Sequence, residues 1–134
     1  MRRLLFLILY AFAPLFSEEC DYAFQGKHFI ASYYGCSQDA LLSKEELQKV
    51  MLFASESSGA GILKHVDYHF DGGGYTLAIL LSESHASIHT YPEHNACFVD
   101  LFTCGDHCSH ETFNEILTNF LKPEDAHIRS IVRN

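Results

Sequence analysis

The chain has 134 residues, enough for one domain, and its 48% hydrophobic and 19% charged residues exclude a disordered protein. A formal net charge of −8 argues against a nucleic-acid backbone as partner. Its five cysteines are an odd number, which excludes a complete set of internal disulfides.

Residues 1–25 stand apart as a hydrophobic leader. Arg2 and Arg3 precede an apolar stretch from Leu4 to Phe16, and the small residue Ser17 follows it. This order is typical of a secretory signal, and the stretch is short for a membrane span. The other interpretation is an N-terminal extension of a cytosolic protein. Under both interpretations, contact with a membrane would involve only an uncleaved leader.

Residues 26–134 form the predicted domain, which opens with a β-prone run from His28 to Tyr34. The pattern Ser43-Lys-Glu-Glu46 is a capping box that predicts the start of a helix. This helix should end near Gly59 and bury one face, formed by Leu47, Val50, Met51 and Ala54. Residues 62–70 then alternate as a half-buried strand would.

The second half of the domain is predicted to contain mostly strands. A turn at 71–74 leads into the apolar run 75–81, and further β-prone runs cover 85–90 and 96–102. Ser109 can cap a second helix that ends before Pro123. The buried face of that helix should comprise Phe113, Ile116, Leu117 and Phe120. A last strand is expected over 126–132.

The predicted order is therefore β-α-β-β-β-β-α-β. Strands joined by hairpins favour an α+β fold, a two-layer sandwich with a mainly antiparallel sheet and two helices on one face. Such a sheet leaves its other face partly uncovered. We therefore expect it to pack against a second copy of the chain, as a homodimer.

Most of the reactive side chains lie between Ser82 and Cys104, where hydroxyls, imidazoles, an acid and a thiol occur close together. A serine or cysteine nucleophile with a histidine base is one interpretation, and solvated strand edges are the other. The glycine patterns of hydrolase elbows and nucleotide-binding loops are absent. Cys104 and Cys108 lack a second, similarly spaced pair, so we predict no metal site.

The segment Leu81-Ser-Glu-Ser-His-Ala-Ser-Ile-His-Thr-Tyr-Pro-Glu93, followed by Asp100-Leu-Phe-Thr-Cys-Gly105, resembles the bacterial S-adenosylmethionine decarboxylase proenzymes. The resemblance extends from Gly26 to the end of the chain and includes Gly26-Lys-His-Phe and Tyr34-Gly-Cys36. The offsets of 5 from the serine to the histidine and of 20 to the cysteine also agree with the family.

The resemblance implies that the chain cuts itself between Glu83 and Ser84. The Ser84 hydroxyl would attack the Glu83 carbonyl to form an ester, and β-elimination would then separate residues 1–83 from 84–134. Thr76 matches a family hydroxyl residue and would stabilise the oxyanion of the first step. The family's base for the elimination corresponds to His89, for which a hydrogen-bonded strand residue is the other interpretation.

The resemblance further implies that Ser84 becomes a pyruvoyl group, the self-generated cofactor. Its ketone would form a Schiff base with the substrate amine and accept the electrons released with carbon dioxide. Cys104 would act as the proton donor, or else serve as a small buried hydrophobic residue.

The implied substrate is S-adenosylmethionine, and the product would be the aminopropyl donor of spermidine biosynthesis. Phe70 and Tyr91 match ring residues that bind the sulfonium and adenine, although Tyr91 stands where the family often has tryptophan. Glu93 matches the acid that binds the ribose. The acidic balance of the chain suits a cationic ligand or ordinary solubility.

Other functions remain open at this point. A decarboxylase of arginine or ornithine would use the same chemistry with a different pocket. A non-catalytic ligand-binding relative would not need Ser84, His89 and Cys104 together. An exported metal-binding module would account for the leader and the histidines but not for Glu83-Ser84. Because S-adenosylmethionine is a cytosolic metabolite, we expect a cytoplasmic protein.

Overall fold

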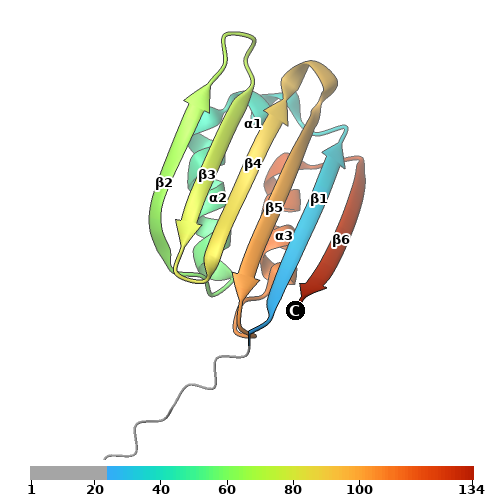
Figure 1. The fold of residues 1–134 in the computed structure, drawn as a ribbon. Helices are drawn as coiled ribbons and strands as arrows, with labels where there is room; N and C mark the ends of the chain where they lie inside the picture. Colours follow the sequence, from blue (N-terminus) through green and yellow to red (C-terminus); the bar gives the residue numbers. More distant parts are fainter. Residues whose placement is uncertain (1–23) are drawn as a thin grey trace, which may run out of the picture.

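The computed structural model describes residues 24–134, which form one six-stranded antiparallel sheet with helices on one face (Figure 1). The strand order is β2-β3-β4-β5-β1-β6. The strands are β1 (Gly26–Tyr34), β2 (Ile62–His69), β3 (Tyr75–Leu81), β4 (Ser84–Tyr91), β5 (Ala96–Cys104) and β6 (Asp125–Arg133). The helices are α1 (Gln38–Leu42), α2 (Lys44–Ser57) and α3 (His110–Leu121), and η1 (Pro92–His94) is a short 3₁₀ turn.

The predicted α+β sandwich is confirmed, with one helix more than expected among the described residues. Helix α1 has only five residues, too few to show a helical period in the sequence. Its presence also changes the role of Ser43, which ends α1 and begins α2. The Ser43 hydroxyl donates to the Asp39 carbonyl (2.7 Å) and makes no cap bond to α2. The hydrogen bond predicted by the capping box was therefore wrong, although the helix start was right.

The core lies between α2 and α3 and the four inner strands. Leu47, Met51 and Ala54 of α2 are buried as predicted, and so are Phe113 and Leu117 of α3. Ile116 and Phe120 pack against this core while partly buried, and Val50 does the same from α2. Ser109 caps α3 as predicted, since its hydroxyl accepts a hydrogen bond from the Thr112 N–H (3.1 Å).

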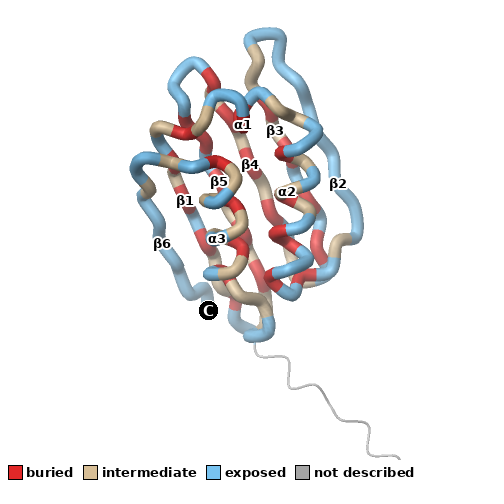
Figure 2. The backbone as a smooth tube through the Cα atoms, turned by 180° about the vertical axis from the view of Figure 1, so that it is seen from behind, coloured by how far each residue is buried: buried red, intermediate tan, exposed pale blue. Residues whose placement is uncertain are grey.

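Strand β2 is not half-buried, contrary to the prediction from its alternating pattern. Leu63 is 59% exposed and Val66 is 69% exposed, and every residue of the strand after Ile62 is exposed. The reason is its position, because β2 is an edge strand and only its first residue, Ile62, packs against the core. Strand β6 forms the other edge and is similarly exposed, and both edges appear pale in Figure 2.

The face of the sheet opposite the helices carries no cover among the described residues, and we call it the open face. Large exposed apolar side chains lie on it, namely Ile30, Val66, Tyr68, Leu80, Phe98 and Ile131. Exposed apolar patches of this kind mark interaction surfaces. No helix within residues 24–134 is long and apolar enough to cross a membrane. The predicted leader lies almost wholly outside the described residues.

Candidate active site

The Glu83–Ser84 bond lies where β3 turns into β4, directly beside the end of β5. Ser84 is the first residue of β4 and pairs with Thr103 of β5. The backbone N–H of Cys104 donates a hydrogen bond to the Glu83 carbonyl oxygen (3.0 Å). The carbonyl of the predicted scissile bond is therefore polarised by a fixed donor. We call Glu83, Ser84 and Cys104 the cleavage end of β4.

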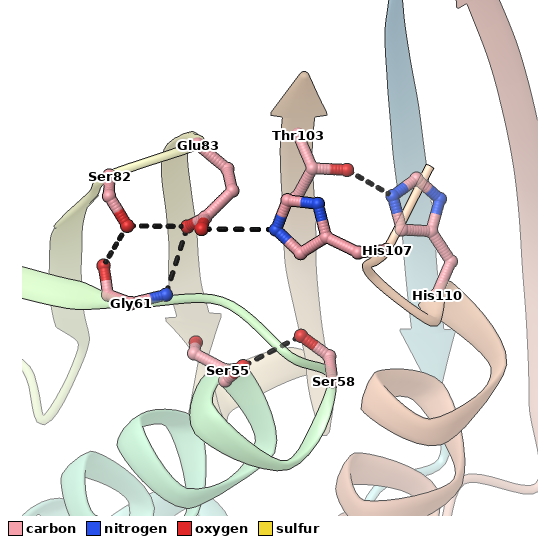
Figure 3. Close-up of polar contacts among 8 residues, drawn as sticks. All are labelled: Ser55, Ser58, Gly61, Ser82, Glu83, Thr103, His107 and His110. Atoms are coloured by element: carbon pink, nitrogen blue, oxygen red, sulfur yellow. Dashed lines mark hydrogen bonds and ion pairs between the residues drawn. The ribbon is translucent and has the colours of Figure 1, made fainter. Parts of the chain in front are cut away.

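The side chain of Glu83 is held by three donors (Figure 3). The Gly61 N–H and the Ser82 hydroxyl each lie 2.9 Å from Oε2, and His107 Nε2 lies 3.2 Å from Oε1. Burial raises the pKa of the Glu83 carboxyl, but the hydrogen bonds from Gly61, His107 and Ser82 outweigh it, so the pKa is lowered overall. The residue before the scissile bond is thus fixed at its backbone and its side chain.

A polar chain on the open face connects Ser84 to Asp100. Ser84 Oγ lies 3.2 Å from Nδ1 of His85, and Nε2 of that ring lies 3.8 Å from Asp100 Oδ1. The other oxygen of Asp100 accepts a hydrogen bond from the Ser87 hydroxyl (2.8 Å), and His28 Nε2 lies 3.5 Å from Oδ1. These side chains project from β1, β4 and β5, which are adjacent in the sheet.

Cys104 lines a cavity of about 240 Å³ at the same end of the sheet. The cavity is also lined by Gly26, Phe102 and Arg133. A Cβ at Gly26 would collide with the Phe102 ring, so any side chain there would displace that ring. The Arg133 guanidinium stacks over that ring, 4.4 Å from its centroid. The Cys104 side chain is therefore accessible from this cavity.

The remaining predicted residues gather at the opposite end of β4, which we call the far end: Thr76, His89, Phe70 and Tyr91. Thr76 pairs with His89 across β3 and β4, and its hydroxyl shares a hydrogen bond with Nδ1 of that ring. The His89 ring packs against Phe70 (5.6 Å between centroids) and Tyr91 (4.6 Å). A histidine is thus held by a hydroxyl between two aromatic rings.

A second cavity, of about 510 Å³, adjoins the far end. It is lined by Tyr34, Tyr91, His94, Ala96 and Phe98. Its volume falls within the usual range for small-ligand sites, and its walls carry ring faces suited to a nucleoside base. Glu93 lies next to it on η1 and is exposed, so its carboxylate is free to reach a ligand.

The two groups of predicted residues do not meet within one chain. His89 follows Ser84 by five residues along the same strand, which corresponds to roughly 16 Å. Thr76 lies opposite His89 and is therefore just as far from the Glu83 carbonyl. In the same chain, the Cys104 N–H occupies the place that we predicted for the Thr76 hydroxyl.

Sequence reasoning missed several groups at the cleavage end. The adjacency of His85 to Ser84 in the sequence was the only available signal for that contact, and nothing in the sequence linked Glu83 to Gly61 or His107. Side-chain N, O and S atoms that could bind a metal ion lie within 4.8 Å of one another in Glu83, His107 and Cys108, and likewise in His28, His85 and Asp100. Burial and the Glu83 carboxylate raise the pKa of the Cys108 thiol to about 11.

A family model described as S-adenosylmethionine decarboxylase matches residues 27–134 of this chain. The chain belongs to the S-adenosylmethionine decarboxylase family. The resemblance inferred from the Leu81–Glu93 segment is thereby confirmed.

Individual members of the S-adenosylmethionine decarboxylase family are similar to this chain over most of their own length. The S-adenosylmethionine decarboxylase proenzyme 2 of Bacillus cereus is 37% identical over 84% of this chain and 92% of its own length. The proenzyme of Methanococcus maripaludis is 39% identical over 81% of this chain and 88% of its own. The crystal structure of the adenosylmethionine decarboxylase from Aquifex aeolicus superposes with a TM-score of 0.73 at 29% identity, covering 79% of this chain and 88% of that one.

Proposed function

We propose that this chain is a self-processing, pyruvoyl-dependent S-adenosylmethionine decarboxylase that supplies the aminopropyl donor for polyamine synthesis. The observation that carries the proposal is the hydrogen bond from the Cys104 N–H to the Glu83 carbonyl. A donor in this position stabilises negative charge on that oxygen when a nucleophile attacks its carbon. The nucleophile is the neighbouring hydroxyl of Ser84.

The self-cleavage proceeds in two steps. In the first, Ser84 Oγ bonds to the Glu83 carbonyl carbon, the amide C–N bond breaks and an ester forms. In the second, a base removes the Ser84 α-proton, the ester C–O bond breaks and the Glu83 carboxylate leaves. The remaining dehydroalanine takes up water, loses ammonia and becomes the pyruvoyl group at the start of the 84–134 fragment. We assign the base of the second step to His89.

His89 reaches Ser84 only if two copies of the chain pack through their open faces. A two-fold axis across β4, in the plane of the open face, reverses the strand direction in the partner. The cleavage end of one copy then faces the far end of the other. The exposed apolar side chains of the open face give such a homodimer its driving force. Each active site would then contain Ser84 and Cys104 of one copy with Thr76 and His89 of the other.

The cleavage end suits a pyruvoyl group, since the Ser84 hydroxyl contacts His85 of the open face and the Glu83 carbonyl already has its donor. When present, the group supplies a ketone that withdraws the electrons left behind by carbon dioxide. Cys104 delivers a proton from its thiol at the neighbouring cavity. Phe70 and Tyr91 hold the sulfonium and adenine between their rings, and Glu93 accepts the ribose hydroxyls.

The test is the mass of the purified protein and its release of carbon dioxide. We expect two fragments that meet between Glu83 and Ser84, the second beginning with a pyruvoyl group, while Ser84→Ala remains one chain. Carboxyl-labelled S-adenosylmethionine should lose its label, and labelled arginine and ornithine should not. An uncut wild-type chain would refute self-processing, and release from an amino acid alone would reassign the substrate. Because the proposed substrate is cytosolic, the active protein should fractionate with the cytoplasm.

A further inference from the structure

His85 contacts the attacking atom of the proposed self-cleavage, and the reaction as described above leaves the first proton transfer unassigned. We propose that His85 is the general base of the first step and takes the Ser84 hydroxyl proton, while Asp100 positions the His85 ring. This proposal rests on the proposed function. His85 is then a catalytic residue of processing, and Asp100 a positioning residue.

The geometry supports this assignment at both ring nitrogens of His85. Nδ1 lies 3.2 Å from Ser84 Oγ, within the distance at which a histidine can accept the hydroxyl proton. Nε2 faces Asp100 Oδ1 at 3.8 Å, so the carboxylate favours the tautomer with the proton on Nε2. Nδ1 is left with its lone pair directed toward the serine. This arrangement of serine, histidine and aspartate is the one that activates nucleophiles in acyl transfer.

Asp100 is itself held in place. The Ser87 hydroxyl donates to Oδ2 at 2.8 Å, and His28 Nε2 approaches Oδ1 at 3.5 Å from the neighbouring strand. The carboxylate is about one-third exposed, with a side-chain exposure of 32%. It therefore keeps its orientation and can stabilise the imidazolium that forms when His85 accepts a proton.

His85 would act on Ser84 of its own chain, whereas His89 would act on Ser84 of the other copy. His85 touches Ser84 of its own chain, whereas His89 lies roughly 16 Å away along β4. The two steps of cleavage therefore use different histidines. Ester formation needs only one folded chain, and elimination needs the second copy.

In the first step, His85 accepts one proton and later returns it. The Ser84 hydroxyl proton moves to Nδ1 as Oγ bonds to the Glu83 carbonyl carbon, and the Cys104 N–H binds the oxyanion. The protonated ring then gives the same proton to the Ser84 nitrogen as the C–N bond breaks. The products are the ester and a free Ser84 amine, with His85 restored.

The test follows the full chain after cell-free synthesis, with samples quenched at intervals and split for treatment with hydroxylamine, which cleaves the ester but not an amide. His85→Gln should slow loss of the intact chain by about 100-fold or more. It should also leave the chain resistant to hydroxylamine, because no ester forms. Asp100→Asn should slow the reaction less. His127→Gln is the matched control, since His127 also pairs with an aspartate (Asp125, 3.3 Å), but on β6.

Several outcomes would overturn the assignment. His85→Gln that is cut within about threefold of the wild-type rate, or that accumulates a hydroxylamine-sensitive ester, would show that His85 is not the base of the first step. Should His85→Gln unfold, His85→Gly is compared with and without imidazole: acceleration by imidazole supports the proposal, and an unchanged rate overturns it. A wild-type chain that never forms fragments would instead refute the proposed function, so the two failures are distinguishable.

Discussion

The two ends of β4 carry similar residue types in different surroundings. At the cleavage end, hydrogen bonds fix a backbone carbonyl and a carboxylate, and the reactive groups are small. At the far end, aromatic rings surround one histidine next to a cavity. The cleavage end is therefore suited to making and breaking covalent bonds, and the far end to binding a flat, cationic ligand.

Neither end alone carries all the residues that the proposed reaction uses. Phe70 and Tyr91, the ring residues assigned to the substrate, lie at the far end of β4 and not beside Ser84 and Cys104, and His89 has no scissile bond next to it. In the homodimer proposed above, association of two chains through their open faces would complete two sites at once. The predictions below test how far the ends act separately, beginning with the largest effect.

Mixing two inactive variants gives the strongest test. Ser84→Ala lacks the nucleophile and should stay intact, and His89→Ala should stop at the hydroxylamine-sensitive ester. Coexpressed with tags of different mass, they form mixed dimers in which intact His89 faces intact Ser84. Only the His89→Ala chain should then be cut, as read on a denaturing gel. A mixture that stays uncut would mean that the far end does not act across the interface.

Replacing the thiol at the cleavage end should separate processing from decarboxylation. In Cys104→Ala the backbone N–H remains, so the chain should still be cut. Without the proton donor, release of carbon dioxide should fall by about 100-fold. Cys108→Ala is the control: the raised pKa of about 11 keeps that thiol protonated at neutral pH, and both activities should persist. Loss of cutting in Cys104→Ala would assign a processing role to the thiol itself.

The hydrogen bonds that Gly61, Ser82 and His107 make to the Glu83 carboxylate should make the stability of the protein sensitive to acid. The folded-state pKa of Glu83 is lowered, so its stabilisation is present above the unfolded value of about 4.3 and is lost as pH falls through the folded value. In an uncut Ser84→Ala background, Glu83→Gln should lower the free energy of unfolding by about 1–2 kcal/mol at pH 7.

Denaturant titrations at several pH values measure this difference, which should narrow as pH falls below the unfolded value of about 4.3. Glu115→Gln, at an exposed position of α3, provides the control and should change little at any pH. A difference that persists unchanged at pH 3 would show that the carboxylate is not the group responsible.

The smallest expected effect compares two serines at helix starts. Ser109 caps α3, the helix that follows the loop carrying His107. Ser109→Ala should therefore lower the free energy of unfolding by about 1 kcal/mol. Ser43 makes no cap bond to α2, so Ser43→Ala should lower the free energy of unfolding by only a few tenths of a kcal/mol. Thermal unfolding measures both. Equal losses would contradict the capping assignment.

Much of the fold followed from the sequence because local patterns determine strands and helices. The apolar stripes of α2 and α3 and the turn after Phe70 were read correctly, since each depends on neighbouring residues alone. The exposure of β2 was not predictable, because alternation reveals a strand and not what covers it. Helix α1 was missed because five residues show no period.

The candidate site was predictable as a set of residues but not as an arrangement. The family resemblance indicated Ser84, His89 and Cys104 together, yet the spacing of five along a strand separates the first two. A sequence cannot say which copy of a chain supplies a residue. Glu83 contacts Gly61 and His107, which are 22 and 24 residues away from it in the sequence. No local sequence pattern predicts contacts over such separations.

The strand order also has a consequence for the protein after it is cut. β1, β2 and β3 would belong to one fragment and β4, β5 and β6 to the other, but the order β2-β3-β4-β5-β1-β6 inserts β1 between β5 and β6. The fragments are therefore interleaved along three shared ladders, and neither can leave without dismantling the sheet. Once separated, they should reassemble only by a bimolecular reaction, so recovery after denaturation would depend on concentration in the cut protein and not in the uncut chain.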